Sequence, residues 1–160
     1  MVAFNSRIMV EKLSRKINIL EAHSSLGYAG GQRNMITFCK NLDRNIFNVF
    51  AAAYREGGRY EDVLKAIGVD YAVSNGSADK ILEFIKANKI DVMHIHRSGR
   101  TVPLETEIIK GAKEINRGMI IIEKNVFGKF DSICDDDIDC SFFQSKMHLN
   151  ERYLQTSGKQ

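Results

Sequence analysis

Four groups of residues that could take part in chemistry each follow a short apolar run in this 160-residue sequence. They are a glycine loop at 27–32 with Gly30 and Gly31, the pair His94 and His96, the pair Glu123 and Asn125, and Ser145 with Lys146. If each apolar run is a parallel strand, all four groups lie at one edge of the sheet, where open α/β folds bind ligands. The shared edge therefore predicts one cleft built from all of them.

The glycine loop leads directly into a stretch with helical spacing. Gly30 and Gly31 would let a ligand approach the backbone closely, and the helix start suits an anion such as phosphate. A purely geometric role in the turn is the alternative. The loop lacks the G-x-G-x-x-G spacing of dinucleotide sites and the Gly-Lys-Ser/Thr ending of a P-loop. The next apolar run ends in Ala53, Tyr54 and Arg55 without a ribose-binding acid, so we do not expect an NAD-dependent oxidoreductase.

The two histidines stand two residues apart on an expected strand, so their side chains should share one face. No carboxylate or cysteine at usable spacing joins them, and the sequence therefore predicts no metal site. We expect His94 to be a buried hydrogen-bonding residue, and His96, nearer the strand tip, to border the cleft. His23, just past the first strand, faces the same cleft or caps that strand.

A carboxylate ends the most apolar run of the chain. Burying Glu123 there is costly unless it is paired or faces water, and we expect the cleft to supply that water. The aspartates around Asp136 lack EF-hand spacing, and no Ser or Cys stands in a nucleophile elbow. Calcium binding and nucleophilic catalysis are therefore not indicated.

The elements that must position these groups alternate between strand and helix. Apolar runs predict strands near 17–20, 47–53, 70–73, 91–96, 119–122 and 140–143, with helical spacing after each of them except 119–122, which a polar loop follows. Residues 54–59 read as a polar break. The helix beginning at Pro103 is expected to bury Leu104, Ile108, Ala112 and Ile115. Right-handed crossovers then predict an α/β fold, a single Rossmann-like, doubly wound parallel sheet of about six strands.

Composition and charge fit one globular domain at 16–160 after a basic extension at 1–15. The net charge is +3, and residues 1–16 alone account for it, so no basic stripe suits nucleic acid. The extension reads as a frayed or docked segment, or as a short basic anchor on an anionic membrane or a partner. No run is long enough to span a bilayer, no secretory signal is visible, and the three cysteines lack metal-type spacing. We expect a cytoplasmic protein, or one that binds peripherally to the inner face of the membrane.

Four stretches taken together resemble the N-terminal half of GT-B type, retaining glycosyltransferases, the group that includes bacterial mannosyl- and glucosyltransferases. They are ILEAHSSLGYAGGQRNMITFCKNL, IDVMHIHRSG, IIIEKNVFGKFD and FFQSKMHLNERY, and the resemblance covers residues 16–155. It implies that the chain is one half of a GT-B architecture, in which two Rossmann-like domains face each other across a cleft. The N-terminal domain of such enzymes binds the acceptor, and the C-terminal domain holds the nucleotide-sugar donor.

The resemblance also implies roles for individual residues. Gly30 and Gly31 would lie against the donor's diphosphate and sugar, and His96 would border the transferred sugar. Glu123 would join His96 as the second catalytic side chain, where the fifth strand opens into the cleft. The remaining binding residues implied in this way are His23, Asn125 and Ser145.

The chain departs from the family in one large respect. The family's nucleotide-binding residues, including the basic residues that stabilise the leaving diphosphate, have no counterpart here. We therefore expect little turnover by this chain alone. The implied partners are a nucleotide-sugar donor, a glycan or lipid-linked acceptor, and a C-terminal GT-B domain in cis or in trans, with no cofactor. A stand-alone Rossmann-like binding or regulatory module is the alternative.

Overall fold

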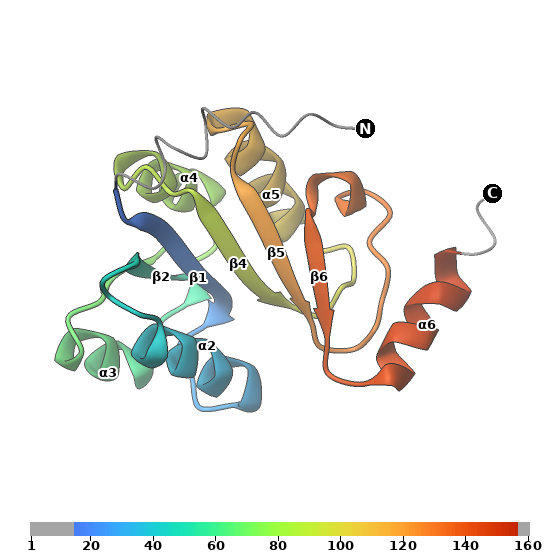
Figure 1. The fold of residues 1–160 in the computed structure, drawn as a ribbon, viewed down its shortest axis with the longest axis horizontal. Coiled ribbons are helices and arrows are strands. Elements are labelled where there is room, and N and C mark those ends of the chain that lie inside the picture. The colour runs from blue at the N-terminus through green and yellow to red at the C-terminus, as the bar shows by residue number, and fades with distance from the viewer. Residues whose placement is uncertain (1–14, 157–160) are drawn as a thin grey trace.

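The computed structural model describes residues 15–156, and the basic extension expected at 1–15 lies almost entirely outside them. Strands and helices alternate along the chain (Figure 1). The elements are β1 (Ile17–Ser25), α2 (Gly30–Asn41), β2 (Phe47–Glu56), α3 (Tyr60–Ala66), β3 (Asp70–Val73), α4 (Ala78–Ala87), β4 (Val92–Arg97), α5 (Pro103–Ile115), β5 (Ile120–Asn125), the 3-10 turn η1 (Asp135–Asp137), β6 (Cys140–Phe143) and α6 (Lys146–Thr156).

The six strands form one all-parallel sheet in the order β3-β2-β1-β4-β5-β6. The fold is therefore the expected α/β, Rossmann-like sheet. The strand order reverses between β1 and β4, because the chain first builds outward to β3 and then returns to the other side of β1. That junction is the topological switch point, where open parallel sheets leave a crevice at the carboxyl ends of their strands.

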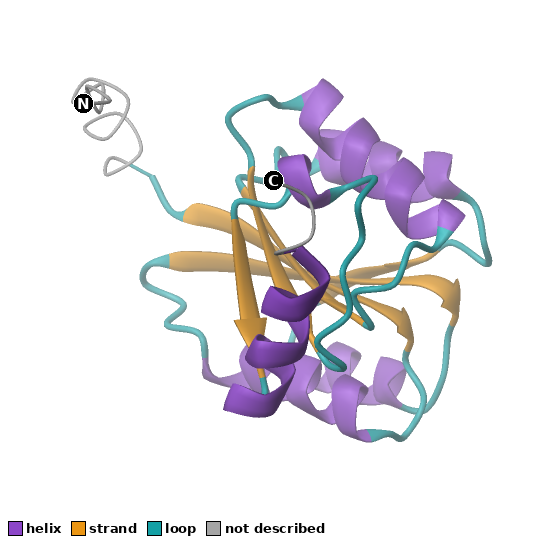
Figure 2. Cartoon of the chain, turned by 90° about the vertical axis from the view of Figure 1, so that its right-hand side faces the viewer, coloured by secondary structure: helices purple, strands orange, loops and turns teal. Residues whose placement is uncertain are grey.

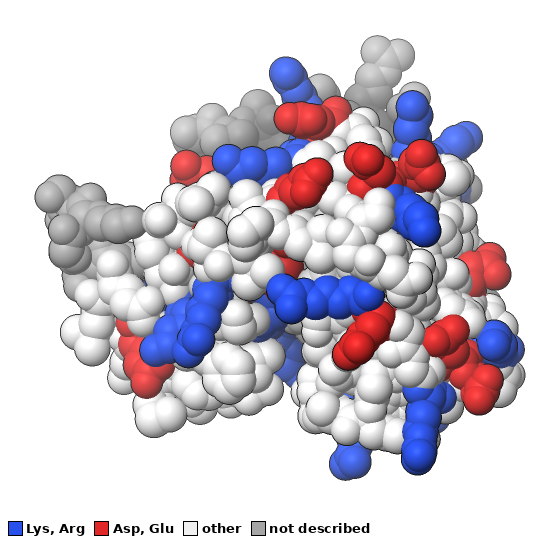
Figure 3. All heavy atoms as spheres, turned by 180° about the vertical axis from the view of Figure 1, so that it is seen from behind, with Lys and Arg blue, Asp and Glu red and all other residues white. Residues whose placement is uncertain are grey.

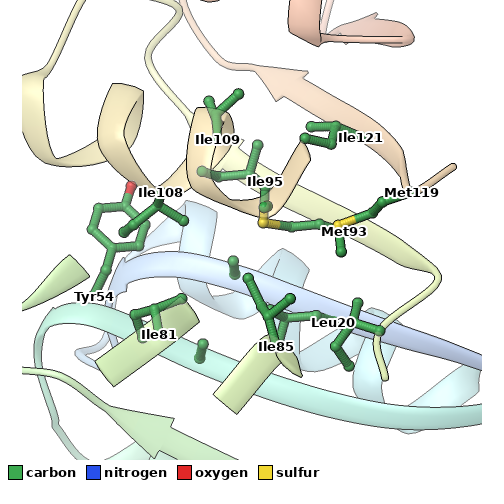
Figure 4. Close-up of a cluster of buried hydrophobic side chains, with 14 of the residues drawn as sticks. Leu20, Tyr54, Ile81, Ile85, Met93, Ile95, Ile108, Ile109, Met119 and Ile121 are labelled. Carbon is green, nitrogen blue, oxygen red and sulfur yellow. The ribbon is translucent and has the colours of Figure 1, made fainter. Parts of the chain in front are cut away.

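Helices lie on both sides of the sheet (Figure 2). On one side, α4 and α5 pack against alternate residues of the central strands, and Figure 4 shows Leu20, Met93 and Ile95 meeting Ile85 and Ile108 there. On the other side, α2 and α3 cover β1, β2 and β3 through a second buried cluster. Alternation along each strand therefore decides which side chains enter which layer.

Most strands of the structure lie close to the ranges expected from the sequence, and β3 and β6 have the expected bounds. The polar break expected at 54–59 is wrong in its first half, because β2 continues to Glu56 and Tyr54 is buried. The face expected for α5 needs correction as well. Ile108 and Ala112 are buried, but Ile115 is 39% exposed and Ile109 takes its place in the core.

The surface is mixed in charge. In Figure 3, which shows the side turned away from the viewer in Figure 1, basic and acidic side chains are interspersed rather than gathered by sign. None of the helices in the described part of the chain combines the length and apolarity that crossing a bilayer requires.

Candidate functional site

A pocket of about 360 Å³ opens at the carboxyl ends of β1 and β4, at the switch point of the sheet. Three of the residues expected at the cleft, His23, Gly31 and His96, line it. The other lining residues are Ser24, Tyr54, Arg55, Arg97, Ser98, Glu105, Val126 and Phe127. The pocket therefore lies where the fold predicts a ligand, with more polar groups around it than the sequence suggested.

The start of α2 forms one wall of this pocket. A Cβ atom on Gly31 would lie 2.5 Å from His23 Nε2, so glycine is what allows the His23 ring to rest against the helix start. The N-cap residue Ala29 makes no side-chain capping bond, and the first turn holds no acidic residue. The N–H groups of this turn are therefore suited to an anion.

Beneath α2, a carboxylate joins the two histidines. Glu21 of β1 lies in register with His94 of β4, and His96 follows two residues later on the same face. The Glu21 carboxylate is 3.0 Å from His94 Nδ1 and 2.9 Å from His96 Nε2, and Phe38 of α2 packs edge-on against both rings. The expectation that no carboxylate joins these histidines is thus wrong. The prediction that His94 is a buried hydrogen-bonding residue is confirmed.

Burial controls the protonation of this histidine layer. Burial opposes the charge on Glu21, but hydrogen bonds from His94 and His96 hold its pKa below the ordinary value. Burial lowers the pKa of His96, against the attraction of Glu21. Burial, aided by repulsion from His96, lowers the pKa of His23 to about 4. The Ser25 N–H donates to His23 Nδ1 at 3.3 Å, which requires a lone pair on that nitrogen and fits a neutral ring.

Two imidazoles and a carboxylate also form a set of ligand types that zinc accepts. The ligand atoms of Glu21, His94 and His96 all lie within 4.8 Å of one another, the one such set among the described residues. The two imidazole nitrogens lie 2.9 to 3.1 Å from the carboxylate oxygens, which are ordinary hydrogen-bond lengths, so hydrogen bonds alone account for the arrangement. The absence of a metal site stays a prediction.

On the opposite face of β4, Arg97 is buried among three carboxylates. Its Nε atom lies 3.1 Å from Glu105 Oε2 and 3.5 Å from Glu123 Oε1, and its Nη2 atom lies 2.5 Å from Asp131 Oδ2. Burial opposes ionisation of Arg97, but the bond to Asp131 and the nearby carboxylates raise its pKa. Burial also works against the Asp131 charge, yet bonds from Thr101 and Arg97 hold its pKa well below the usual range.

This cluster reaches the pocket through Arg97, Glu105 and Tyr54. The Tyr54 hydroxyl donates to Glu105 Oε1 at 2.7 Å, and burial raises the pKa of Glu105. Arg97 Nη1 and His96 Nδ1 are two of the buried side-chain atoms that have no hydrogen-bond partner among the described residues. Together with the exposed Arg55, the pocket offers a polar wall that can bind hydroxyls and an anion.

No family model matches the sequence. No curated protein matches it either. Among solved structures, a carbon-sulfur lyase involved in aluminium resistance from Clostridium novyi NT is similar, with 20% sequence identity and a TM-score of 0.38. The match covers 74% of this chain and 27% of that one, so this chain spans about a quarter of the length of that protein. A likeness of this size carries no argument about function.

The remaining predicted residues lie apart from the pocket lining. Glu123 is 1% exposed and accepts a hydrogen bond from Ser141 Oγ at 2.9 Å, so the expectation that cleft water solvates it is wrong. Asn125 is fully buried and donates to the Lys129 carbonyl at 2.7 Å. Ser145 is exposed and accepts from the backbone of α6. Gly30 begins α2, and a Cβ there would meet no atom within 4 Å.

Sequence reasoning missed Glu21, Arg97, Glu105 and Tyr54. A signal for Glu21 was present, because it is the one charged residue inside the first apolar strand. It also stands two residues before His23, so the two side chains lie on the same face of that strand. Arg97 follows His96 directly and gave a weaker signal. Glu105 and Tyr54 could not be recognised, since they meet across 51 residues of sequence.

Proposed function

We propose that this chain is the acceptor-side half of a retaining, GT-B type glycosyltransferase that transfers a sugar from a nucleotide-sugar to a glycan or lipid-linked acceptor. One observation carries the proposal: His23, Gly31 and His96, expected at the cleft from the sequence, line a single pocket at the switch point of a Rossmann-like sheet. The resemblance of four ordered stretches to that family supports it.

Each wall of the pocket has a part in this proposal. The uncapped start of α2, where Gly31 lines the pocket, would accept a phosphate oxygen of the donor. His96, neutral because burial lowers its pKa, donates through Nε2 to Glu21, so it would border the sugar and accept a hydrogen bond from one of its hydroxyls through Nδ1. Arg55 and Glu105 would hold acceptor hydroxyls on the opposite side.

The proposed reaction needs a second domain. Departure of a nucleoside diphosphate requires positive charge or backbone donors on the leaving phosphates. Within the described residues, Arg97 is already balanced by three carboxylates within 3.5 Å, and no other buried cation lines the pocket. A C-terminal nucleotide-sugar domain, in cis or in trans, would supply that charge.

The test is sugar transfer and donor hydrolysis by the 160-residue chain, alone and with a C-terminal GT-B domain. We expect transfer only from the pair, and at least a 10-fold loss with His96→Ala. His148→Ala, on α6 and absent from the pocket lining, is the matched control and should leave transfer unchanged. Robust transfer by the chain alone would refute the need for a second domain, and transfer unaffected by His96→Ala would refute the role of the pocket.

The second candidate is a Rossmann-like binding or regulatory module without catalysis. The carboxylates around Arg97 favour it, because they neutralise the buried cation of the pocket and leave it suited to an uncharged, hydroxyl-rich ligand. This candidate predicts that the chain binds a sugar by itself and that no added domain elicits donor turnover. The same transfer assay therefore separates the two.

A further inference from the structure

Four polar side chains behind the pocket stand in two rows across β1 and β4. Glu21 is in register with His94, and His23 is in register with His96. Because side chains two residues apart on a strand share a face, the four form one layer, and Phe38 of α2 packs on both rings of β4. The second row, His23 and His96, lines the pocket, and the first row is absent from the lining. The first row can therefore act on a ligand only through the second.

The carboxylate of Glu21 decides which nitrogen of His96 carries the proton. Burial opposes the charge on Glu21, but hydrogen bonds from the two histidines of β4 hold its pKa below the ordinary value, so it is ionised. An ionised carboxylate accepts hydrogen bonds and cannot donate them. His96 Nε2, which lies 2.9 Å from Glu21 Oε2, is therefore the donor. Burial lowers the pKa of His96 and keeps the ring neutral, so Nδ1 presents a lone pair.

The ring of His23 is held in the same tautomer but is turned the other way. The Ser25 N–H donates to His23 Nδ1 at 3.3 Å, so in the neutral ring the proton is on Nε2. Burial, aided by repulsion from His96, lowers the pKa of His23 to about 4 and keeps that ring neutral as well. The Nε2 atom lies against Gly31, since a Cβ there would be 2.5 Å from it. His23 therefore adds a donor beside the N–H groups that begin α2.

The two rings, whose centroids are 6.2 Å apart, give the pocket a fixed polarity. His96 Nδ1 is buried and has no hydrogen-bond partner among the described residues. A buried acceptor without a partner is costly, and a ligand O–H would satisfy it, whereas a phosphate oxygen would bring only more lone pairs. Beside His23, the donor and the uncapped start of α2 favour an acceptor oxygen or an anion.

We propose that the two histidines select ligands by hydrogen-bond polarity, with a hydroxyl O–H against His96 Nδ1 and a phosphate oxygen against His23 Nε2 and the start of α2. The ligand class is a phosphorylated sugar, either free or as part of a nucleotide-sugar. Glu21 is the positioning residue, because it fixes His96 without contacting the ligand. The inference rests on the proposed function, since it takes this pocket to be the sugar site.

The first test examines the two rings in the free chain, before any ligand is added. In nitrogen-15 NMR of the imidazole rings, we expect His23 and His96 to carry their protons on Nε2. The bond to Glu21 should protect the Nε2 proton of His96 from exchange with water, and Glu21→Leu should abolish that protection. A proton on Nδ1 of either ring, or an unprotected Nε2 proton of His96 in the unsubstituted chain, would overturn the inference and leave the proposed function intact.

The second test measures ligand selection by the same chain. The probes are glucose 1-phosphate, mannose 1-phosphate and UDP-glucose, each with deoxy and deoxyfluoro analogues that cannot donate a hydrogen bond at the altered position. At one hydroxyl position we expect both analogues to bind about 10-fold more weakly than the parent, or worse. Glu21→Leu should reduce this difference to less than about 3-fold. The matched control is Glu107→Leu, an exposed carboxylate of α5 outside the pocket lining, and should keep the full difference.

The outcomes separate this inference from the proposed function. Equal affinity for parents and analogues at every position would overturn the selection and leave sugar binding by the pocket in place. No binding by any probe would overturn the proposed function and the selection with it. Where the parents bind, tighter binding of UDP-glucose assigns the phosphate at α2 to the donor, and tighter binding of a free sugar phosphate assigns it to the acceptor.

Discussion

Loss of stability between pH 6.5 and pH 4.5 should trace in large part to His23. Its pKa is about 4 in the folded chain against an ordinary value of 6.5, with burial as the main cause and His96 as the second. Between these two values the unfolded chain binds a proton that the folded chain does not. The free energy of unfolding therefore falls as pH is lowered from 6.5 towards 4. It rises again as pH is raised from 4 to 6.5.

The magnitude follows from the pKa difference. One pKa unit corresponds to about 1.4 kcal/mol, so the full window contributes up to about 3 kcal/mol, somewhat less because the ring is partly exposed. The pKa of His96 is also lowered, so His96 adds a further loss of stability as the pH falls. Glu21 acts at lower pH, since its pKa lies below 4.5 and its contribution disappears only there.

The assay is urea unfolding at a series of pH values from 7 to 4.5. In His23→Asn, an amide oxygen can accept the Ser25 N–H in place of Nδ1 and nothing titrates. We expect this variant to lose stability more slowly on acidification, by up to about 1.4 kcal/mol per pH unit. Parallel curves for His23→Asn and the unsubstituted protein would refute this explanation.

Three further substitutions test the pocket walls. Tyr54→Phe removes the buried bond to Glu105 and should lower the free energy of unfolding by about 1–2 kcal/mol in urea titration; no change would mean that the bond contributes nothing. Arg97→Met leaves Asp131 and its neighbours unpaired and should cost about 3–5 kcal/mol in the same assay, so a loss under about 1 kcal/mol would contradict the ion-pair account. Gly31→Val should displace the flexible His23 ring rather than break the fold, leaving the melting temperature nearly unchanged while weakening ligand binding; unchanged binding would make this glycine a turn residue only.

The fold could be predicted because its signals are local. The runs at 70–73 and 140–143 are short, apolar and bounded by polar residues, and they became β3 and β6 as expected. The end of β2 could not be predicted in the same way. Tyr54 looks like the start of a polar loop, and only the bond to Glu105, 51 residues later, explains why its hydroxyl is buried.

The candidate site was only partly predictable for a related reason. Strand ends can be located along the chain, so His23, Gly31 and His96 were placed correctly at one edge. Side-chain pairing across strands depends on register, which the sequence does not encode locally. Glu21 meets His94 only because β4 inserts beside β1 in this register. The pairing of Glu123 could not be predicted for the same reason. It was expected to face water and is instead buried beside Arg97.

The central claim is that the pocket at the carboxyl ends of β1 and β4 binds a sugar-containing acceptor. The most direct measurement is a backbone amide NMR titration of the 18.1 kDa chain with a panel of glycosides, sugar phosphates and nucleotide-sugars. We predict that a glycoside or sugar phosphate shifts the amides of Gly31, Arg97 and Ser98 together, with little effect on α3 or α6. Shifts centred elsewhere, or no shift with any sugar, would contradict the claim.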